Sequence, residues 1–140
     1  MTTEALYHYL QSQHLAVVSS VSSAGMPQSA VVGIAVSPQL ELIFDTVSSS
    51  RKYINLIANA NIAVVIGWDN ETTVQLEGIA SLLPSGEAHP LKDIYFHTFH
   101  DARQRADTWP DLVHFVITPH WIRYSNFNEL NNPVQEWDLK

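Results

Sequence analysis

Two adjacent cations, Arg51 and Lys52, follow the serines Ser48, Ser49 and Ser50 where the sequence predicts the start of a short helix. A serine hydroxyl satisfies an orphan backbone N–H at a helix start, and the remaining free N–H groups favour an anion. A guanidinium grips two phosphate oxygens, and a neighbouring ammonium adds a second charge. The segment is therefore a candidate phosphate site. An ordinary capped helix with two solvated cations is the alternative interpretation.

Short strands joined by turns surround this segment. Apolar alternation over 40–45 predicts a strand before the cations, and the apolar run 62–68 is typical of a strand buried on both faces. The whole pattern predicts strands over 15–21, 28–36, 40–45, 62–68, 72–83 and 112–124, and helices over 3–13, 48–59 and 87–106. The last strand is expected to bend at Pro119, and the polar tail 126–140 to be a loose arm. About six strands with short helices indicate a mainly β, antiparallel barrel.

The order of these elements resembles the pyridoxamine-phosphate-oxidase-like family of FMN-binding split barrels. The strand, the Ser-Arg-Lys motif, the short helix ending near Asn59 and the following apolar strand carry the resemblance. The turn at Gly25-Met26-Pro27 looks like part of the first hairpin of the family. The segment 75–80 looks like its long middle strand, and 118–125 looks like its last strand. The resemblance covers most of the chain and implies a single split-barrel domain over residues 1–140.

The resemblance implies that the candidate phosphate site holds FMN. In the family, the Arg and Lys of this motif hold the flavin phosphate, and a Thr at the preceding strand end assists them. The implied cofactor-binding residues are the hydroxyls of Thr46 and Ser50, the cations Arg51 and Lys52, and the main chain of Ala30, Val31 and Val32 at the ring edge. Related split barrels use the same groove for the deazaflavin F420 or for haem. The sequence holds no motif that separates these cofactors from FMN.

The departures from the family bear on the reaction. Pyridoxine/pyridoxamine phosphate oxidases carry an Arg and a Lys in the second strand, and these places fall on Ala30 and Ala35 here. They also end in an Arg-Leu-His-Asp-Arg segment, whereas residues 126–140 contain neither Arg nor His. We therefore do not expect that activity. The sequence leaves a small FMN-dependent oxidoreductase with unassigned catalytic residues and substrate, or a non-catalytic flavin- or ligand-binding module.

Composition limits the partners and the location. The chain has 140 residues, of which 46% are hydrophobic and only 15% charged, so some apolar surface is expected to enter a homodimer interface. In the family the cofactor groove also lies between two barrels. A net charge of -7 argues against nucleic acid as the partner. Without a signal-like start or a membrane-length apolar run, we expect a cytoplasmic protein with no membrane partner.

The histidines suggest a metal site only weakly. His97 and His100 are spaced i, i+3 on the predicted helix 87–106, with Asp93 and Asp101 nearby. A zinc site needs three or four ligands, and the chain has no cysteine to supply thiolates. His97 also lies among aromatic residues, where packing is the common role. We therefore predict structural or surface histidines and no metal.

Overall fold

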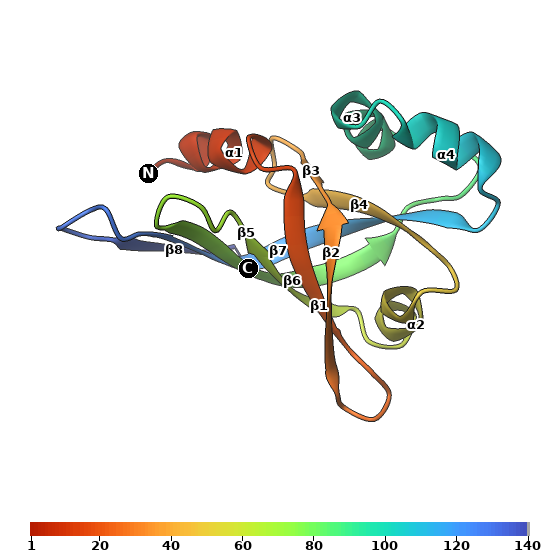
Figure 1. The fold of residues 1–140 in the computed structure, drawn as a ribbon, viewed down its shortest axis with the longest axis horizontal. Coiled ribbons are helices and arrows are strands. Elements are labelled where there is room, and N and C mark those ends of the chain that lie inside the picture. The colour runs from red at the N-terminus through yellow and green to blue at the C-terminus, as the bar shows by residue number, and fades with distance from the viewer. Residues whose placement is uncertain (140) are drawn as a thin grey trace.

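The strands form one antiparallel sheet that curls on itself, and the helices lie around it (Figure 1). The computed structural model describes residues 1–139. The strands are β1 (Leu15–Val21), β2 (Pro27–Gly33), β3 (Ala35–Val36), β4 (Leu42–Val47), β5 (Asn61–Ile66), β6 (Thr72–Leu82), β7 (Leu112–Asn126) and β8 (Val134–Asp138). The helices are α1 (Thr3–Gln11), α2 (Arg51–Ala58), α3 (Pro90–Thr98) and α4 (Ala102–Thr108).

The strand order is β2-β1-β5-β6-β7-β4-β3, and β8 pairs with the second half of β7. β2 contacts β4, so the two ends of the curled sheet meet. These features confirm the predicted mainly β, antiparallel split-barrel fold. Within residues 1–139 the sheet has eight strands where about six were expected, because the second predicted strand divides and the C-terminal tail pairs with β7.

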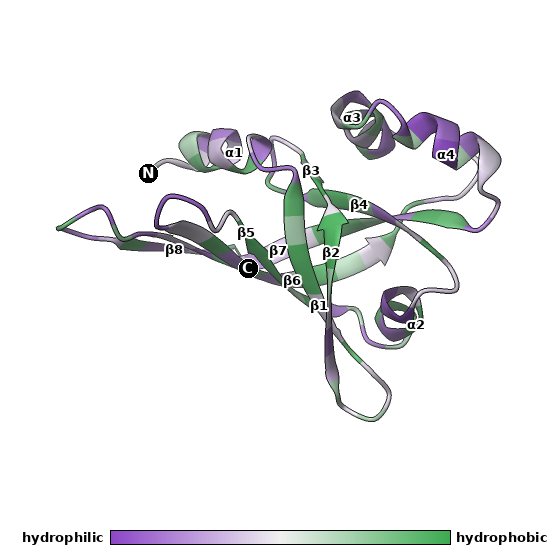
Figure 2. Cartoon of the chain, viewed as in Figure 1, coloured by the Kyte–Doolittle hydropathy of each residue, from purple (hydrophilic) through white to green (hydrophobic). Residues whose placement is uncertain are grey.

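The core lies inside the curl of the sheet. Helix α1 covers one end and buries Leu6 and Leu10, as the apolar spacing of the sequence predicts. On β5, alternate residues such as Val64 point inward, while Val65 on the other face is 39% exposed. Within the single chain, the expectation that this strand is buried on both faces is therefore wrong. Figure 2 shows green, hydrophobic segments on β1, β2 and β5.

The predicted second strand breaks at Ile34. Its N–H donates to the carbonyl of His14 at 3.0 Å, which is the next pair in the β1–β2 register, and the next strand begins only at Ala35. The chain then enters β3, which lies at the opposite end of the sheet from β2. Alternation alone predicts one long strand here, because the residues on both sides of the break are apolar.

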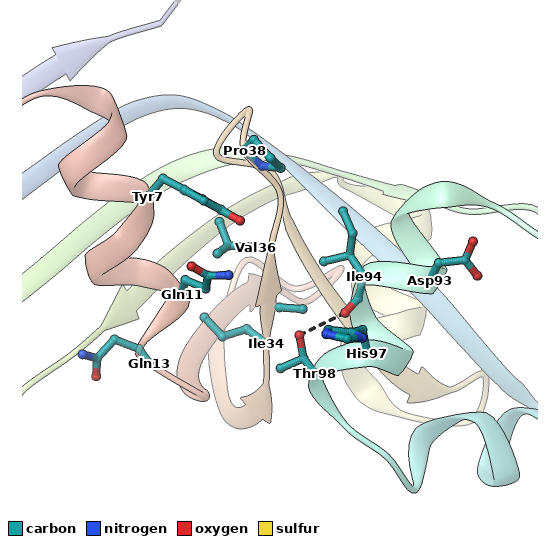
Figure 3. Close-up of a pocket in the computed structure, with 11 residues that line it drawn as sticks. Tyr7, Gln11, Gln13, Ile34, Val36, Pro38, Asp93, Ile94, His97 and Thr98 are labelled. Atoms are coloured by element: carbon teal, nitrogen blue, oxygen red, sulfur yellow. Dashed lines mark hydrogen bonds between the residues drawn. The ribbon is translucent and has the colours of Figure 1, made fainter.

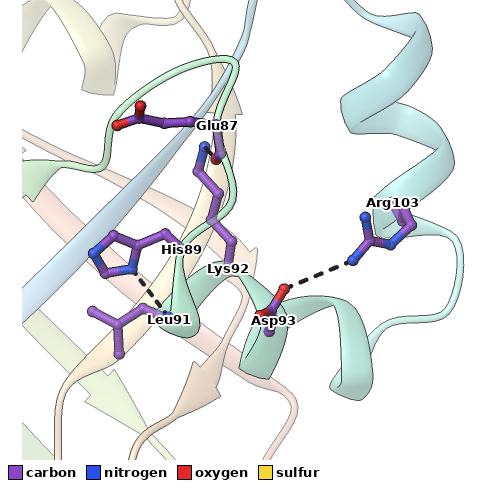
Figure 4. A network of polar contacts seen from close by, with 6 residues as sticks. All are labelled: Glu87, His89, Leu91, Lys92, Asp93 and Arg103. Carbon is purple, nitrogen blue, oxygen red and sulfur yellow. Dashed lines mark hydrogen bonds and ion pairs between the residues drawn. The ribbon is translucent and has the colours of Figure 1, made fainter.

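The predicted helix over 87–106 is two helices. Helix α3 begins after His89, whose Nδ1 accepts from the N–H of Leu91 at 3.1 Å, and Pro90 takes its first position (Figure 4). It ends at Thr98, the C-cap residue Phe99 is extended (φ -121°, ψ 102°), and α4 follows. An ion pair of 3.7 Å between Asp93 and Arg103 links the two helices. None of the helices within residues 1–139 is long and apolar enough to cross a membrane.

The C-terminal tail is not a loose arm over the part that the structure describes. Residues 134–138 form β8, and residue 140 lies outside the described residues. Arg123 of β7 donates through Nε to Glu136 of β8 at 2.8 Å, and Trp137 packs against the main core. The sequence did not predict this strand, because its residues alternate between half-buried and exposed positions and are therefore mostly polar.

The predicted bend at Pro119 is confirmed as a β-bulge. The register between β6 and β7 shifts between Glu77 and Gly78, so that Gly78 lies opposite Pro119. Proline has no N–H to give to a ladder, and a bulge is one of the few places where a sheet accepts it.

Candidate functional site

Helix α2 begins with a cap that two residues build together. Ser50 is the N-cap, and its Oγ accepts from the backbone N–H of Tyr53 at 3.2 Å. The hydroxyl of Thr46, at the end of β4, also donates to Ser50 Oγ, at 2.9 Å. With two bonds accepted, Ser50 keeps its own hydroxyl proton to donate outward. The first turn is thereby a site with N–H and O–H donors ready for an anion.

A buried amide fixes this helix against the sheet. The Nδ2 of Asn55 donates to Ser20 Oγ at 3.0 Å and to Gln28 Oε1 at 2.9 Å. Asn55 is only 6% exposed, and Leu56 beside it is 3% exposed. Since Gln28 lies on β2, the first turn of α2 is held in a fixed position next to that strand.

The two cations on the first turn carry charge that the protein itself does not neutralise. Arg51 is exposed and Lys52 half-buried, and within residues 1–139 neither forms an ion pair or a side-chain hydrogen bond. Burial lowers the pKa of Lys52, and the neighbouring charge of Arg51 lowers it further, while Asp45 acts in the opposite direction. A bound anion would relieve the repulsion between the two cations.

Ala30, Val31 and Val32 lie on β2, the strand whose Gln28 accepts a hydrogen bond from Asn55 of α2, and within residues 1–139 β2 pairs in the sheet with β1 alone. Val32 points inward and is 8% exposed, whereas Val31 points outward and is 62% exposed. The other edge of β2 has no paired strand in the sheet, so its main-chain N–H and C=O groups lack ladder partners there. All seven predicted site residues therefore lie on β2, the end of β4 and the start of α2.

Their individual roles differ in detail from the expectation. Thr46 is 8% exposed, and its hydroxyl donates to Ser50. Its geometry suits orienting Ser50, and its direct contact with a ligand stays a prediction. Ala35, where the family's strand Lys would fall, is 4% exposed and lines a cavity between α1 and α3. No lysine or arginine lines that cavity, so no side chain there replaces the missing charge.

A polar cluster on the other face of β4, partly buried, was not predicted from the sequence. The Asp45 carboxylate pairs with Arg105 of α4 at 3.3 Å. Burial raises the pKa of Tyr95, and the adjacent charge of Asp45 raises it further. His114 lies opposite Asp45 on β7, is 5% exposed, and its Nε2 has no hydrogen-bond partner among the described residues. The sequence signal for this cluster is a single polar residue within each of two apolar strands, Asp45 in β4 and His114 in β7.

This cluster predicts how stability depends on pH. Burial lowers the pKa of His114, helped by Lys92 and Arg105 and opposed by Asp45. Its protonation therefore favours the unfolded chain, and the contribution of His114 to stability is lost as the pH falls below the ordinary histidine value. We expect His114→Phe, which keeps the edge contacts with Tyr95 and Phe96, to lessen the loss of unfolding free energy between about pH 7 and pH 5.

The slope attributable to one proton is at most about 1.4 kcal/mol per pH unit. Urea unfolding of both proteins across this pH range measures it. His100→Phe serves as control, because His100 is exposed in the turn before α4, and this substitution should leave the slope unchanged. Parallel pH profiles for the wild type and His114→Phe would contradict this account of the buried imidazole.

The predicted pair of histidines does not share a helix. His97 lies on α3, but His100 lies in the turn before α4, because α3 ends at Thr98. The expected i, i+3 spacing on one helix is therefore wrong. Among residues 1–139, no group of three or more His, Asp or Glu side chains is placed to hold a metal ion.

Fold and site together define a small antiparallel split-barrel protein with a candidate anion site at a helix start. The family model for pyridoxamine 5'-phosphate oxidase matches residues 2–126, and the chain belongs to that family. No curated protein matches the sequence.

Solved structures with this fold include proteins named for different ligands. General stress protein 26 from Bacillus anthracis is 22% identical, with 98% of each chain covered and a TM-score of 0.75. A pyridoxamine 5'-phosphate oxidase-related, FMN-binding protein from Nostoc punctiforme is 13% identical over 96% of this chain and 84% of that one (TM-score 0.69). The haem storage protein HutZ from Vibrio cholerae is 13% identical over 85% of this chain and 91% of that one (TM-score 0.70). At these identities the likeness shows the fold alone.

Proposed function

We propose that the chain binds FMN, with the phosphate at the first turn of α2. The observation that carries this proposal is the pair of unneutralised cations, Arg51 and Lys52, on a protein of net charge -7. Elsewhere the structure pairs such charges, as Arg123 with Glu136 and Arg105 with Asp45. Two adjacent cations left free beside N–H donors, on a helix fixed by Asn55, fit a dianionic phosphate.

The residues present divide the work of holding such a group. Ser50 donates its hydroxyl proton, Arg51 offers two parallel N–H donors, and Lys52 adds a compact charge. Thr46 keeps Ser50 oriented through their hydrogen bond. The open edge of β2 at Ala30, Val31 and Val32 offers main-chain groups to the polar edge of the ring. The flavin itself, when bound, supplies hydride or one-electron transfer.

The reaction we propose is oxidoreduction of a small substrate, without pyridoxamine-phosphate oxidase activity. A doubly charged pyridoxal phosphate needs cations, and Ala30 and Ala35 stand where the family's strand cations would lie. The alternative is a non-catalytic flavin- or ligand-binding module. F420 and haem remain the alternative cofactors, and a structural neighbour named as a haem storage protein supports haem as the second of these candidates.

A visible absorption spectrum of the purified protein tests the cofactor, before and after addition of FMN and desalting. Retention of the flavin bands after FMN, but not after riboflavin, supports the proposal. A Soret band in the protein as purified would replace FMN with haem, and the long-wavelength band of a deazaflavin would replace it with F420. A colourless protein that retains nothing after desalting would contradict the proposal.

Turnover separates the enzyme from the binding module. We expect the FMN-loaded protein to consume NADH or NADPH in the presence of oxygen faster than an equal concentration of free FMN. A protein that holds FMN without accelerating this reaction, with either donor, is better described as a binding module. The comparison with free FMN matters because unbound flavin also reacts slowly with both donors.

We propose further that the protein is a homodimer whose interface includes the outer face of β2, β1 and β5. Val17 pairs with Val31 on one side and with Val65 on the other, which gives a row of valines across three strands. Val31 is 62% and Val65 39% exposed. Because β2 also borders the candidate cofactor site, a second barrel on this face would cover the site.

A charge at the β2 end of this row is expected to disrupt the dimer. Val31→Glu should shift the protein from dimer to monomer, because burial of an unpaired carboxylate from each protomer in the interface is costly. Light scattering coupled to size exclusion measures the change, and FMN affinity should fall with it. Met26→Glu is the matched control, since Met26 is 60% exposed at the β1–β2 turn. A wild-type protein that runs as a monomer would contradict the proposed interface.

A further inference from the structure

The curled sheet closes along a seam where β2 meets β4, and no β-ladder joins these two strands. β2 pairs with β1 alone and β4 pairs with β3 and β7, although β2 and β4 contact each other. Within residues 1–139, the one hydrogen bond that crosses this seam runs from Asn55 Nδ2 of α2 to Gln28 Oε1 of β2, at 2.9 Å. The two sides of the candidate FMN site are therefore tied to each other by a single side-chain amide.

The position of Asn55 on α2 suits this role. Asn55 follows Arg51 by four residues, so the two lie one helical turn apart on the same side of the helix. It is 6% exposed, and its Nδ2 also donates to Ser20 Oγ of β1 at 3.0 Å. An amide that uses both N–H groups cannot turn without losing a buried hydrogen bond. Asn55 thus holds the first turn of α2 at a fixed distance from β2.

The chain that follows β2 does not provide a second link to α2. It leaves the seam and lines a cavity of about 480 Å³ between α1 and α3, which no residue of α2 lines. Figure 3 shows Ile34 and Val36 of this segment between Tyr7 of α1 and Ile94 of α3. Within residues 1–139 this segment makes no hydrogen bond to α2. The link at Gln28 is therefore the polar link that fixes β2 against the helix start.

We propose that Asn55 is a positioning residue that makes the two parts of the candidate site act as one. This inference rests on the proposed function, because it takes the phosphate to lie at the first turn of α2 and the flavin ring to lie at β2. FMN then engages both parts, whereas riboflavin engages β2 alone. A ligand that binds two parts at once gains affinity from their fixed separation. Asn55 therefore sets how strongly the site prefers FMN to riboflavin.

Two substitutions remove the two hydrogen bonds of the Asn55 amide separately. Gln28→Leu removes the bond to β2, and Ser20→Ala removes the bond to β1. Each leaves one N–H of the same buried amide unpaired, so we expect similar falls in the thermal unfolding temperature. Gln28→Leu should lower FMN affinity at least about tenfold, and Ser20→Ala should keep it within about threefold of the wild type.

Flavin fluorescence quenching measures these affinities, and riboflavin is the ligand control. Riboflavin affinity should stay within about threefold of the wild type in both variants, because this ligand has no phosphate to be positioned. If Gln28→Leu and Ser20→Ala weaken FMN binding equally, or if FMN and riboflavin lose affinity together, the amide supports the fold alone and the proposal fails.

A double-mutant cycle tests whether Asn55 acts through the phosphate contacts. Asn55→Leu should lower FMN affinity at least about tenfold in the wild type. Once Arg51 and Lys52 are both alanine, the same substitution should change FMN affinity less than about twofold, because no phosphate contact is left to position. Equal factors in the two backgrounds would overturn the proposal. Gln28→Leu serves in the same cycle if Asn55→Leu does not fold.

The outcomes separate this inference from the proposed function. A wild-type protein that does not bind FMN contradicts both of them. A protein that binds FMN, loses affinity when Arg51 and Lys52 become alanine and keeps it in Gln28→Leu supports the phosphate site and overturns the role of Asn55.

Discussion

Replacing Arg51 and Lys52 together with alanine is expected to weaken FMN binding by roughly a hundredfold. Each cation would make a charge-assisted contact with the phosphate, and the loss of two such contacts costs about 3 kcal/mol or more. Neither side chain has a partner within the described residues, so its removal leaves no acidic group unpaired. The fold should therefore survive the change. Flavin fluorescence quenching measures the affinity, and thermal unfolding checks the fold.

Riboflavin is the matched ligand control, because it has the flavin ring but lacks the phosphate. Its affinity should barely change in the double variant. Arg103→Ala is the matched protein control, since it removes a surface cation that pairs with Asp93 away from α2. Equal losses of FMN and riboflavin affinity would mean that Arg51 and Lys52 support the fold or the ring and not the phosphate.

The features that the sequence predicts correctly are those with local causes. The start of α2 follows from Ser50, whose hydroxyl caps the helix, and from the tight turn before it. The bend at Pro119 follows from a missing N–H, and the amphipathic start of the chain follows from Leu6 and Leu10. Each of these signals lies within a few residues of the feature that it predicts.

The features that the sequence misses depend on distant residues. The division between β2 and β3 depends on two distant strands, because β2 pairs with β1 and β3 pairs with β4 at the opposite end of the sheet. Phe99 caps the C-terminus of α3, and its ring packs on Gly33 of β2, where an added Cβ would lie 3.0 Å from Phe99 Cζ. Local propensity carries no information on either contact.

The candidate site shows the same division. The motif with Ser50, Arg51 and Lys52 is contiguous, so the sequence could propose it as a unit. Its attachment to β2 through Asn55 is not visible in the sequence, since Asn55 reads as an ordinary polar residue on a short helix. The half-buried pair of Asp45 and Arg105 joins residues far apart in the chain, and a single sequence gives no sign of it.

Gly78→Ala is expected to have the largest effect on stability of the single substitutions considered, with a loss of about 2–4 kcal/mol. A Cβ at Gly78 would overlap the backbone oxygen of Thr118 and lie 3.1 Å from Cα of Pro119. Both atoms belong to the bulged strand β7. The whole of β6 pairs with this strand. The chain at Thr118 cannot move away without loss of ladder hydrogen bonds, so the strain remains in the folded state.

Gly33→Ala provides the matched test of this argument. Its added Cβ would also meet an atom at 3.0 Å, but that atom is the Cζ of Phe99, a side chain at a helix end. A half-buried ring can turn aside by a few tenths of an ångström, so we expect a loss of about 1 kcal/mol or less. Urea unfolding of both variants measures the two losses. If Gly33→Ala destabilises the protein as much as Gly78→Ala, the rigidity of the bulge at Pro119 is not what makes Gly78 necessary.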